Sequence, residues 1–153
     1  MDMNISLLPE AVACGRAENK EQVLAEVSAV FARAYGLDAE AVNEAMEQRE
    51  ALGSTGFGRG VAIPHCRSAE VSRPKMVLLK LPHAVDFRAA DAIPVELVFG
   101  LVSPDKAGAT HLQALAAISR LTRDEAMLAA LLDATEADAL FAILNSRFLR
   151  DAA

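Results

Sequence analysis

The residues best suited to chemistry lie in one glycine-rich stretch, residues 53–65, which ends in a histidine. Glycines occupy positions 53, 56, 58 and 60, an apolar run covers 61–63, and Pro64 precedes His65. Glycine permits positive φ and lets backbone N–H groups approach an anion closely, while proline fixes the chain direction. We expect a flexible loop, a short buried strand and an imidazole at that strand's end. This imidazole could carry a phosphoryl group, act as a base or bind a metal.

Two side chains from elsewhere could join this histidine, namely His111 and Arg49. His111 falls in the first turn of an expected helix, where the N–H groups attract anions and the dipole disfavours imidazolium. We therefore expect a neutral His111 that can donate a hydrogen bond. Arg49 ends the inward stripe of a helix, so its head either reaches water or points at whatever the glycine loop binds. His83 follows a proline in a polar connection and is expected at the surface.

Several common readings of the glycine stretch fail. No Gly-Lys-Ser/Thr follows the glycines, so the loop is not a P-loop, and the strand expected after Gly60 excludes a dinucleotide fingerprint. His65 and Cys66 are adjacent and would point to opposite faces of a strand, which disfavours a structural metal site. Nothing marks Cys66 as a thiol of low pKa. We therefore expect neither a metal nor a cofactor.

What remains is His65 as a nucleophile toward phosphorus, forming an N–P bond that a second acceptor can take. Such a site needs a reachable imidazole, donors for the phosphoryl oxygens and a flat apolar rim for docking. Phe57 could form part of the rim. The candidate donors are Arg49, His111, Ser54, Thr55, and the loop amides, among them Gly56 and Gly58.

The residues alone leave other functions open. A histidine beside a loop can be structural or can act in acid–base chemistry. The stretch could also belong to a binding module that senses an anion or a partner without being phosphorylated. A third possibility is a hydrolase using His65 and His111 as base and acid, although no carboxylate near either histidine in the sequence would set a tautomer.

Composition and length limit the class of protein. The 153 residues, 53% apolar and 24% charged, fit one globular domain and exclude a disordered chain. A net charge of −6 with scattered Lys and Arg makes nucleic acid an unsuitable partner. No apolar run approaches the roughly 18–20 residues that span a bilayer, and residues 1–6 have neither the basic start nor the apolar stretch of a signal peptide. With two cysteines in unrelated contexts, we expect free thiols in the cytoplasm and no membrane insertion.

Apolar residues at three- and four-residue spacing predict the helices that position these side chains. Asn19 should cap a helix that ends near Gly36, and Asp38 a second helix that leads to Arg49. In the C-terminal part, Thr110 and the glutamine three residues later match a capping box, ahead of helices that begin at Asp124 and within 135–138.

Two apolar runs predict the main strands. Residues 76–81 form one, and residues 95–102 are apolar enough for a central position in a sheet. The segments 66–74, 82–94 and 103–108 are expected to be loops or connections. The order of elements predicts an α/β fold in which short strands are flanked by helices.

Residues 49–65 read Arg-Glu-x-Leu-Gly-Ser-Thr-Gly-Phe-Gly-x-Gly-Val-Ala-Ile-Pro-His. This stretch resembles the active-site signature of fructose/mannitol-class (type 2) enzyme IIA domains of the phosphoenolpyruvate-dependent phosphotransferase system. The similarity covers nearly the whole chain and includes Pro-Val-Glu-Leu-Val-Phe at 94–99 and Thr-His-Leu-Gln-x-Leu at 110–115. It implies one domain over residues 1–153, with a mixed sheet of about five strands and helices on both faces.

The resemblance also implies roles for single residues. In that family the histidine matching His65 is phosphorylated on Nε2, and the residues matching His111 and Arg49 line the site and steady the phosphoryl group. Cys66 stands where many members have glycine, which could alter access or make the site redox-sensitive. The implied activity is that of a phosphotransferase component, a phosphohistidine carrier rather than an enzyme turning over a small substrate.

The implied donor is a histidine-containing phosphocarrier protein, and the implied acceptors are regulatory target proteins or a IIB domain. Residues 52–58 and 95–101 look most like the nitrogen-regulatory enzyme IIA branch, whose members end a phosphorelay without transporting sugar. The alternative is a free-standing fructose/mannitol-type IIA that passes its phosphoryl group to a IIB domain for sugar uptake.

Overall fold

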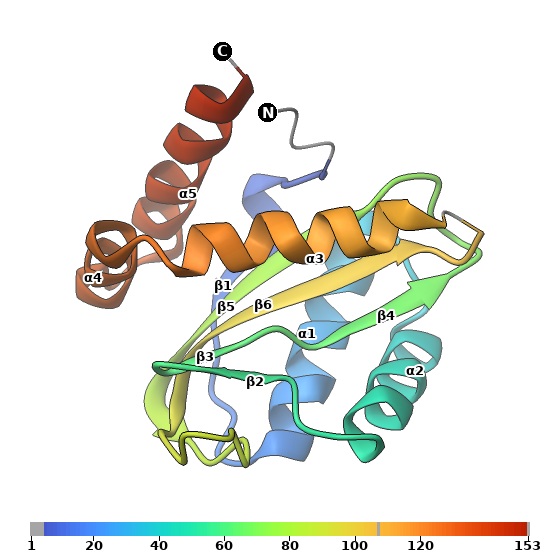
Figure 1. Cartoon of the computed structure of the whole chain (residues 1–153), viewed down its shortest axis with the longest axis horizontal. Coiled ribbons are helices and arrows are strands. Elements are labelled where there is room, and N and C mark those ends of the chain that lie inside the picture. The colour runs from blue at the N-terminus through green and yellow to red at the C-terminus, as the bar shows by residue number, and fades with distance from the viewer. Residues whose placement is uncertain (1–4, 107, 153) are drawn as a thin grey trace.

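A mixed β-sheet forms the centre of the structure, and helices cover both of its faces (Figure 1). The computed structural model describes residues 5–106 and 108–152. The strands are β1 (Val12–Cys14), β2 (Gly56–Gly58), β3 (Val61–Ala62), β4 (His65–Ser68), β5 (Lys75–Val85) and β6 (Val95–Pro104). The helices are the short 3-10 turn η1 (Pro9–Ala11), α1 (Lys20–Tyr35), α2 (Ala39–Ala51), α3 (Ala109–Thr122), α4 (Glu125–Asp133) and α5 (Ala137–Ala152).

The strand order is β1-β5-β6-β3-β2, and β4 also pairs with β6. Strand β6 runs antiparallel to β5 and parallel to both β3 and β4, while β1 is parallel to β5 and β2 antiparallel to β3. Strand β3 lies opposite Leu97 and Val98, and β4 opposite Leu101 to Pro104, so these two strands are successive segments along one edge of β6. The six strands therefore fill five positions across the sheet, and the predicted mixed sheet is confirmed.

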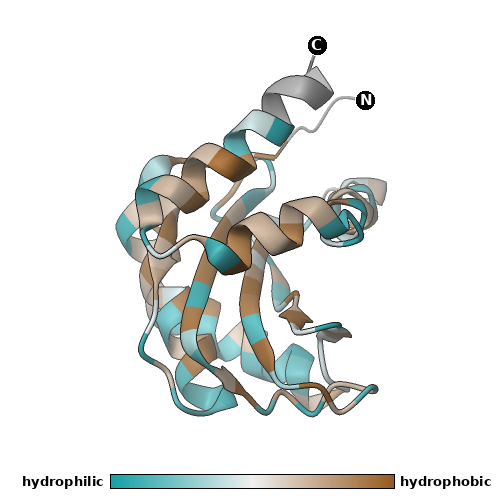
Figure 2. Ribbon diagram, turned by 90° about the vertical axis from the view of Figure 1, so that its left-hand side faces the viewer, coloured by the Kyte–Doolittle hydropathy of each residue, from teal (hydrophilic) through white to brown (hydrophobic). Residues whose placement is uncertain are grey.

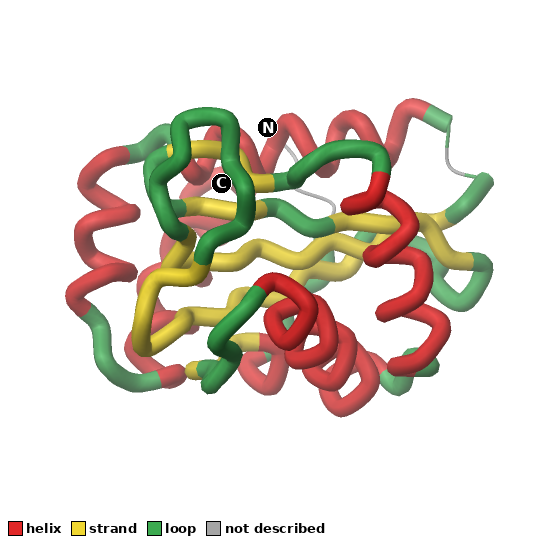
Figure 3. Tube along the Cα trace, turned by 90° about the horizontal axis from the view of Figure 1, so that it is seen from below, coloured by secondary structure: helices red, strands yellow, loops and turns green. Residues whose placement is uncertain are grey.

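Side chains along the central strands point alternately to the two faces of the sheet, so the core has two layers. In β5, Val77 and Leu79 pack with α1 and α2, whereas Met76 and Leu78 pack with α3, α4 and α5. Successive residues of a strand face opposite sides, so a strand covered on both faces must be apolar throughout. Figure 3 shows the strands lying between helices on opposite sides, and Figure 2 shows long hydrophobic segments along the strands.

Several predicted helix boundaries are confirmed by their caps. The side chain of Asn19 accepts the Gln22 N–H, that of Asp38 accepts two N–H groups of the first turn of α2, and that of Asp124 accepts the Met127 N–H. Helix α1 ends at Gly36, whose φ of 71° is the left-handed conformation favoured by glycine. Helix α5 begins at Ala137, inside the predicted window.

The capping box predicted at Thr110 is wrong. Gly108 occupies the N-cap position of α3 with a φ of 56°, and no side chain caps the helix. Because glycine adopts this conformation at little steric cost, the chain turns there and Thr110 is already inside the helix. His111 still lies in the first turn.

Three predictions about the strands also need correction. The segment from Cys66 was predicted to be a loop, but β4 covers 65–68 beside β6. Strand β5 continues to Val85, which pairs with Val95, and so takes in part of the predicted 82–94 connection. The glycine stretch, predicted to be a flexible loop, contains β2 and forms a hairpin with β3. These strands exist because β6 and β3 offer pairing partners, and tertiary pairing outweighs local propensity.

Among the described residues, no helix is both long enough and apolar enough to cross a membrane.

At Gly100 of β6, side chains of α1 pack directly against the backbone of the strand. A Cβ atom there would lie 2.7 Å from Cγ1 of Val27 and 3.0 Å from Cε2 of Phe31, and both side chains are fully buried. We expect Gly100→Ala to lower the free energy of unfolding by about 1–3 kcal/mol, because overpacking forces neighbours from their rotamers. Urea unfolding followed by circular dichroism measures this loss.

The cause can be checked with the double variant Val27→Ala/Gly100→Ala. Removing the methyl groups that collide should relieve part of the strain, so the double variant should lose less stability than the sum of the single variants. Strict additivity of the two losses would contradict this explanation.

Candidate functional site

The structure brings His65 and His111 together at one end of the sheet. The two ring centroids lie 5.4 Å apart, with the ring planes at 48°. His65 is the first residue of β4 and pairs with Leu101 of β6, while His111 stands in the first turn of α3, the helix that follows β6 in the chain. His65 was predicted at the end of a strand, and the structure places it instead at a strand's beginning, just after a break in the β6 edge.

The break between β3 and β4, at Ile63 and Pro64, orients the imidazole. The Pro64 carbonyl accepts the Leu101 N–H at 3.0 Å, which keeps the chain on β6. The Ile63 carbonyl lies 2.8 Å from Nδ1 of His65. A carbonyl oxygen can only accept, so Nδ1 carries the proton and the lone pair of the neutral ring is on Nε2.

Burial and charge keep His65 neutral. The ring is half-buried, and the loss of hydration lowers its pKa below the usual 6.5, although the bond to Ile63 acts in the opposite direction. Arg49 lowers the pKa of His65 further and Glu50 raises it, which places both side chains within electrostatic range of the ring. At neutral pH the imidazole is therefore mostly unprotonated on Nε2, the form needed for nucleophilic attack.

His111 is buried, with 6% of its surface exposed. Burial lowers its pKa to about 4, and the neighbouring His65 and Arg67 add to this effect. The expectation of a neutral His111 is thus confirmed, with burial as the main cause. Among the described residues, its Nδ1 atom has no hydrogen-bond partner. A buried polar atom left unpaired costs about 1–3 kcal/mol, so its presence calls for a functional explanation.

The low pKa of His111 gives a testable pH dependence. The unfolded chain binds a proton near pH 6.5 and the folded chain only near pH 4, so unfolding takes up a proton between these values. The free energy of unfolding should therefore fall as pH drops through this window, by at most about 1.4 kcal/mol per pH unit from this group. Urea titrations should show a shallower pH slope for His111→Gln. An unchanged slope would contradict the assignment.

Arg49 reaches the glycine stretch from the last turn of α2. Its Nη1 donates to the Gly53 carbonyl at 2.8 Å, so the guanidinium is turned toward the hairpin. The guanidinium therefore bonds to the backbone of the glycine stretch, and its contact with a bound group remains a prediction. The bond uses one of the five N–H donors of the group.

The other predicted phosphoryl ligands make contacts within the protein. The Ser54 hydroxyl donates to the Phe87 carbonyl and accepts the Gly56 N–H. Thr55 is buried, and its hydroxyl donates to the carboxylate of Glu50. Gly58 has a φ of 104° and lies against Asp91. Contact of these four residues with a phosphoryl group remains a prediction.

Sequence reasoning missed Glu50 as part of the site. Its Oε1 atom lies 2.7 Å from Nζ of Lys20, and both side chains are nearly buried. Its position directly after Arg49 in the quoted stretch was the available signal. Its partner Lys20 is thirty residues away at the start of α1, so no local sequence pattern predicts this ion pair.

Cys66 is buried in the layer under α1 and α2. Burial raises the pKa of its thiol to about 12, so the sulfur stays protonated at neutral pH. Because the thiolate is the reactive form, Cys66 is a packed side chain rather than a nucleophile beside His65.

Three exposed apolar side chains stand close to predicted site residues in the sequence. Leu52 follows α2 and is 85% exposed, Phe57 lies in β2, and Leu112 follows His111 directly and is 66% exposed. Exposed large apolar side chains near a reactive group are typical of a docking surface. His83, by contrast, is exposed outside this region, as predicted.

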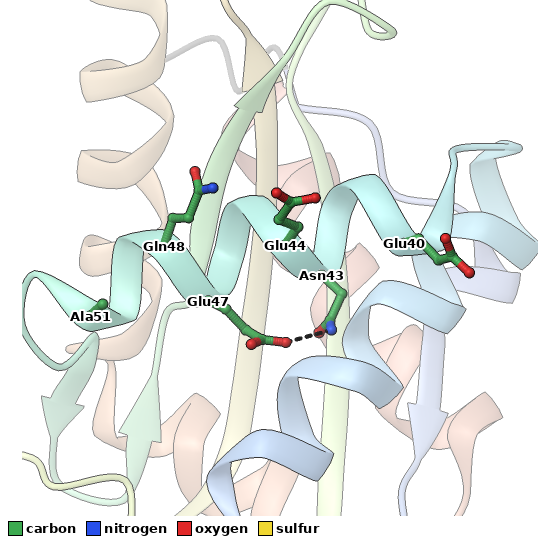
Figure 4. Close-up of a pocket in the computed structure, with 6 residues that line it drawn as sticks. All are labelled: Glu40, Asn43, Glu44, Glu47, Gln48 and Ala51. Atoms are coloured by element: carbon green, nitrogen blue, oxygen red, sulfur yellow. Dashed lines mark hydrogen bonds between the residues drawn. The ribbon is translucent and has the colours of Figure 1, made fainter.

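A hollow lies along the surface of α2 (Figure 4). It is lined by Glu40, Asn43, Glu44, Glu47, Gln48 and Ala51. The Asn43 amide donates to Glu47 at 2.6 Å. The three carboxylates that line the hollow would repel an anion, so the hollow is unsuited to a phosphoryl group.

Comparisons with known proteins identify similar sequences. Residues 7–147 match the family model described as phosphoenolpyruvate-dependent sugar phosphotransferase system, EIIA 2. A nitrogen regulatory protein of Bradyrhizobium diazoefficiens is 39% identical over 137 residues, 89% of this chain and 90% of that protein. The fructose-specific EIIABC component of Bacillus subtilis is 37% identical over 84% of this chain, which corresponds to 20% of that longer protein.

Solved structures show the same fold. The nitrogen regulatory protein IIA-Ntr of Neisseria meningitidis superposes with a TM-score of 0.81 at 30% identity, covering 92% of this chain and 96% of that one. Enzyme IIA for mannitol of Escherichia coli, solved in complex with phosphorylated enzyme IIB, gives a TM-score of 0.76 at 22% identity. That match covers 93% of this chain and 99% of the other.

Proposed function

The chain belongs to the EIIA 2 family of the phosphoenolpyruvate-dependent sugar phosphotransferase system, and from this membership we propose that it carries a phosphoryl group on His65. One observation carries the proposal. The Ile63 carbonyl holds the proton of His65 on Nδ1, which leaves the Nε2 lone pair free beside the neutral ring of His111. A free-standing nucleophilic nitrogen with nearby donors is what phosphoryl capture requires.

The proposed donor is a phosphohistidine on a histidine-containing phosphocarrier protein. The Nε2 lone pair of His65 attacks phosphorus and forms a new N–P bond, while the donor's N–P bond breaks and its electron pair stays on the donor ring. That ring, protonated on its other nitrogen, leaves as neutral imidazole. His65 keeps its Nδ1 proton, and the Ile63 carbonyl stabilises the positive charge that the phosphorylated ring acquires.

Arg49 and His111 are the proposed donors to the transferred group. Phosphoryl transfer passes through a loose transition state whose charge is spread over three oxygens, so positioned N–H donors supply most of the catalysis. Arg49 reaches the hairpin beside His65, and a neutral His111 can donate one N–H. Ser54, Thr55, Gly56 and Gly58 are further candidates. The hydroxyls of Ser54 and Thr55 and the N–H groups of Thr55 and Gly56 would have to exchange their present partners for a phosphoryl oxygen.

For the downstream partner we favour a regulatory target protein in the cytoplasm. This is supported by 39% identity to a nitrogen regulatory protein over about nine-tenths of both chains and by the match to the Neisseria IIA-Ntr structure. The second candidate is a IIB domain acting in sugar uptake, which is favoured by the similarity to the Bacillus fructose-specific component. The exposed Leu52, Phe57 and Leu112 offer an apolar surface on which donor and acceptor could dock in turn.

Reconstitution tests this function. The protein is incubated with enzyme I, a histidine-containing phosphocarrier protein and phosphoenolpyruvate, and its intact mass is measured. We expect one added phosphoryl group that is lost in acid, and no gain when the phosphocarrier is omitted. Absence of any gain with every phosphocarrier tried would refute the proposal.

The two downstream candidates are separated by a second incubation. The phosphorylated protein is mixed with isolated fructose and mannitol IIB domains, and the phosphoryl group is followed by mass on both partners. A regulatory protein should keep its phosphoryl group, whereas rapid loss to a IIB domain would favour the sugar-linked candidate.

A further inference from the structure

The pair formed by Lys20 and Glu50 is the least exposed ion pair among the described residues. Their charged atoms are 2.7 Å apart, and the side chains are only 10% and 6% exposed. The Lys20 Nζ atom also lies 3.5 Å from the Phe87 carbonyl oxygen and 4.9 Å from the centroid of the Phe87 ring. Desolvation makes a buried ion pair a weak source of net stability, so the pair needs another explanation.

A continuous series of hydrogen bonds leads from this pair to His65. The Glu50 carboxylate accepts the Thr55 N–H at 3.1 Å and also the Thr55 hydroxyl. The Thr55 carbonyl accepts the Ile63 N–H at 3.0 Å, and the Ile63 carbonyl binds Nδ1 of His65 at 2.8 Å. Helix α1 is thereby connected to the reactive ring through both ends of the glycine hairpin.

We propose that Glu50, held in place by Lys20, is a positioning residue that keeps the imidazole of His65 in the tautomer protonated on Nδ1. The inference rests on the proposed function, because that tautomer leaves Nε2 free to attack phosphorus. Glu50 acts through Thr55 and Ile63 and has no contact with the transferred group in this role.

The glycine hairpin needs such an anchor. Gly53, Gly58 and Gly60 have φ values of 151°, 104° and 83°, and a segment so rich in glycine loses much conformational freedom when it is ordered. Without the bonds to Glu50, Thr55 would no longer fix the position of the Ile63 carbonyl. The His65 ring could then take the other tautomer, which places a proton on the attacking nitrogen.

Two double variants isolate the acceptor at position 50. Lys20→Met/Glu50→Gln and Lys20→Met/Glu50→Leu both remove the charges and have similar volume, but only glutamine keeps an oxygen for the Thr55 N–H. Tyr35→Phe is the control for general destabilisation, because it removes hydroxyl bonds to the Ser6 and Met76 carbonyls at the other end of α1.

The readout is the 15N NMR spectrum of the His65 ring at a pH above its pKa, together with the rate of phosphorylation. The wild type, the glutamine double variant and Tyr35→Phe should show one tautomer, protonated on Nδ1. The leucine double variant should show a mixture of tautomers and a rate about 10–100-fold lower, the scale seen when a reacting group is misplaced. A change of the His65 tautomer that follows loss of the acceptor at position 50, with no such change in Tyr35→Phe, is the result that a merely structural role would not produce.

If the leucine double variant does not fold, Thr55→Val replaces it. This change removes only the hydroxyl bond to Glu50, and it should populate the second tautomer in part. A single tautomer protonated on Nδ1 in the leucine double variant, or in Thr55→Val where it is used instead, overturns the inference. Slow transfer by that variant with an unchanged tautomer overturns it as well. If the wild type accepts no phosphoryl group while its tautomer still depends on Glu50, the proposed function fails and the positioning by Glu50 stands.

Discussion

His65→Ala is expected to fold and to accept no phosphoryl group under conditions that fully phosphorylate the wild type. The ring is half-buried at the start of an edge strand, so its removal leaves the pairing of β4 with β6 in place. No other described side chain has its nucleophilic nitrogen fixed in this way at the site. Intact-mass measurement after incubation with the complete phosphorelay gives a direct answer.

The chain provides its own control for this variant. His83 is exposed and lies in the later part of β5, so His83→Ala should be phosphorylated like the wild type. His111→Ala should still accept the group, but more slowly. A phosphoryl group found on His65→Ala, or lost in His83→Ala, would show that the wrong histidine has been assigned.

Arg49→Ala is expected to slow phosphorylation about 10–150-fold without unfolding the protein. The change removes hydrogen bonds to a charged group, worth about 1.5–3 kcal/mol, and each 1.36 kcal/mol corresponds to a factor of ten in rate. Rapid-quench measurements over a range of donor concentrations would provide the rate. If Arg49 acts in the transition state, the maximal rate should fall while the concentration for half-saturation changes little.

Arg59→Ala is the matched control for Arg49→Ala. Arg59 belongs to the same hairpin, and its side chain is 49% exposed in an ion pair with Glu125. Surface pairs of this kind contribute little, so the variant should transfer at close to the wild-type rate. Equal slowing in both arginine variants would point to a general effect of positive charge on docking rather than to a donor at the phosphoryl group. Arg49→Lys should recover only part of the rate, because lysine lacks the planar fork.

The helices could be predicted from the sequence because their signals are local. Asn19, Asp38 and Asp124 cap helices as expected, since each side chain satisfies N–H groups two or three residues ahead. Strand β4 could not be predicted in the same way. Its residues His-Cys-Arg-Ser have little β propensity, and they are extended because they lie along the exposed edge of β6.

In the candidate site, too, some residues could be predicted from the sequence and others depend on partners that are distant in the chain. Chemistry and a family resemblance predict His65, His111 and Arg49 as site residues. In the structure the ring centroids of the two histidines lie 5.4 Å apart. Glu50 was not identified, because its role depends on Lys20, a residue of another helix. The engaged hydroxyls of Ser54 and Thr55 could not be anticipated either, since their partners are a distant carbonyl and a buried carboxylate.

Strand β6 supports both halves of the histidine pair, one through its pairing with β4 and the other through the turn into α3. Its side chains are buried on both faces, so the two halves have little freedom to move apart. If His65 is phosphorylated as proposed, we expect the modification to change the charge of the site more than its shape. A phosphoryl group adds close to two negative charges, and at physiological ionic strength their field fades over about 8 Å. A partner would therefore have to be in contact with the protein to distinguish its phosphorylated form from its unphosphorylated form.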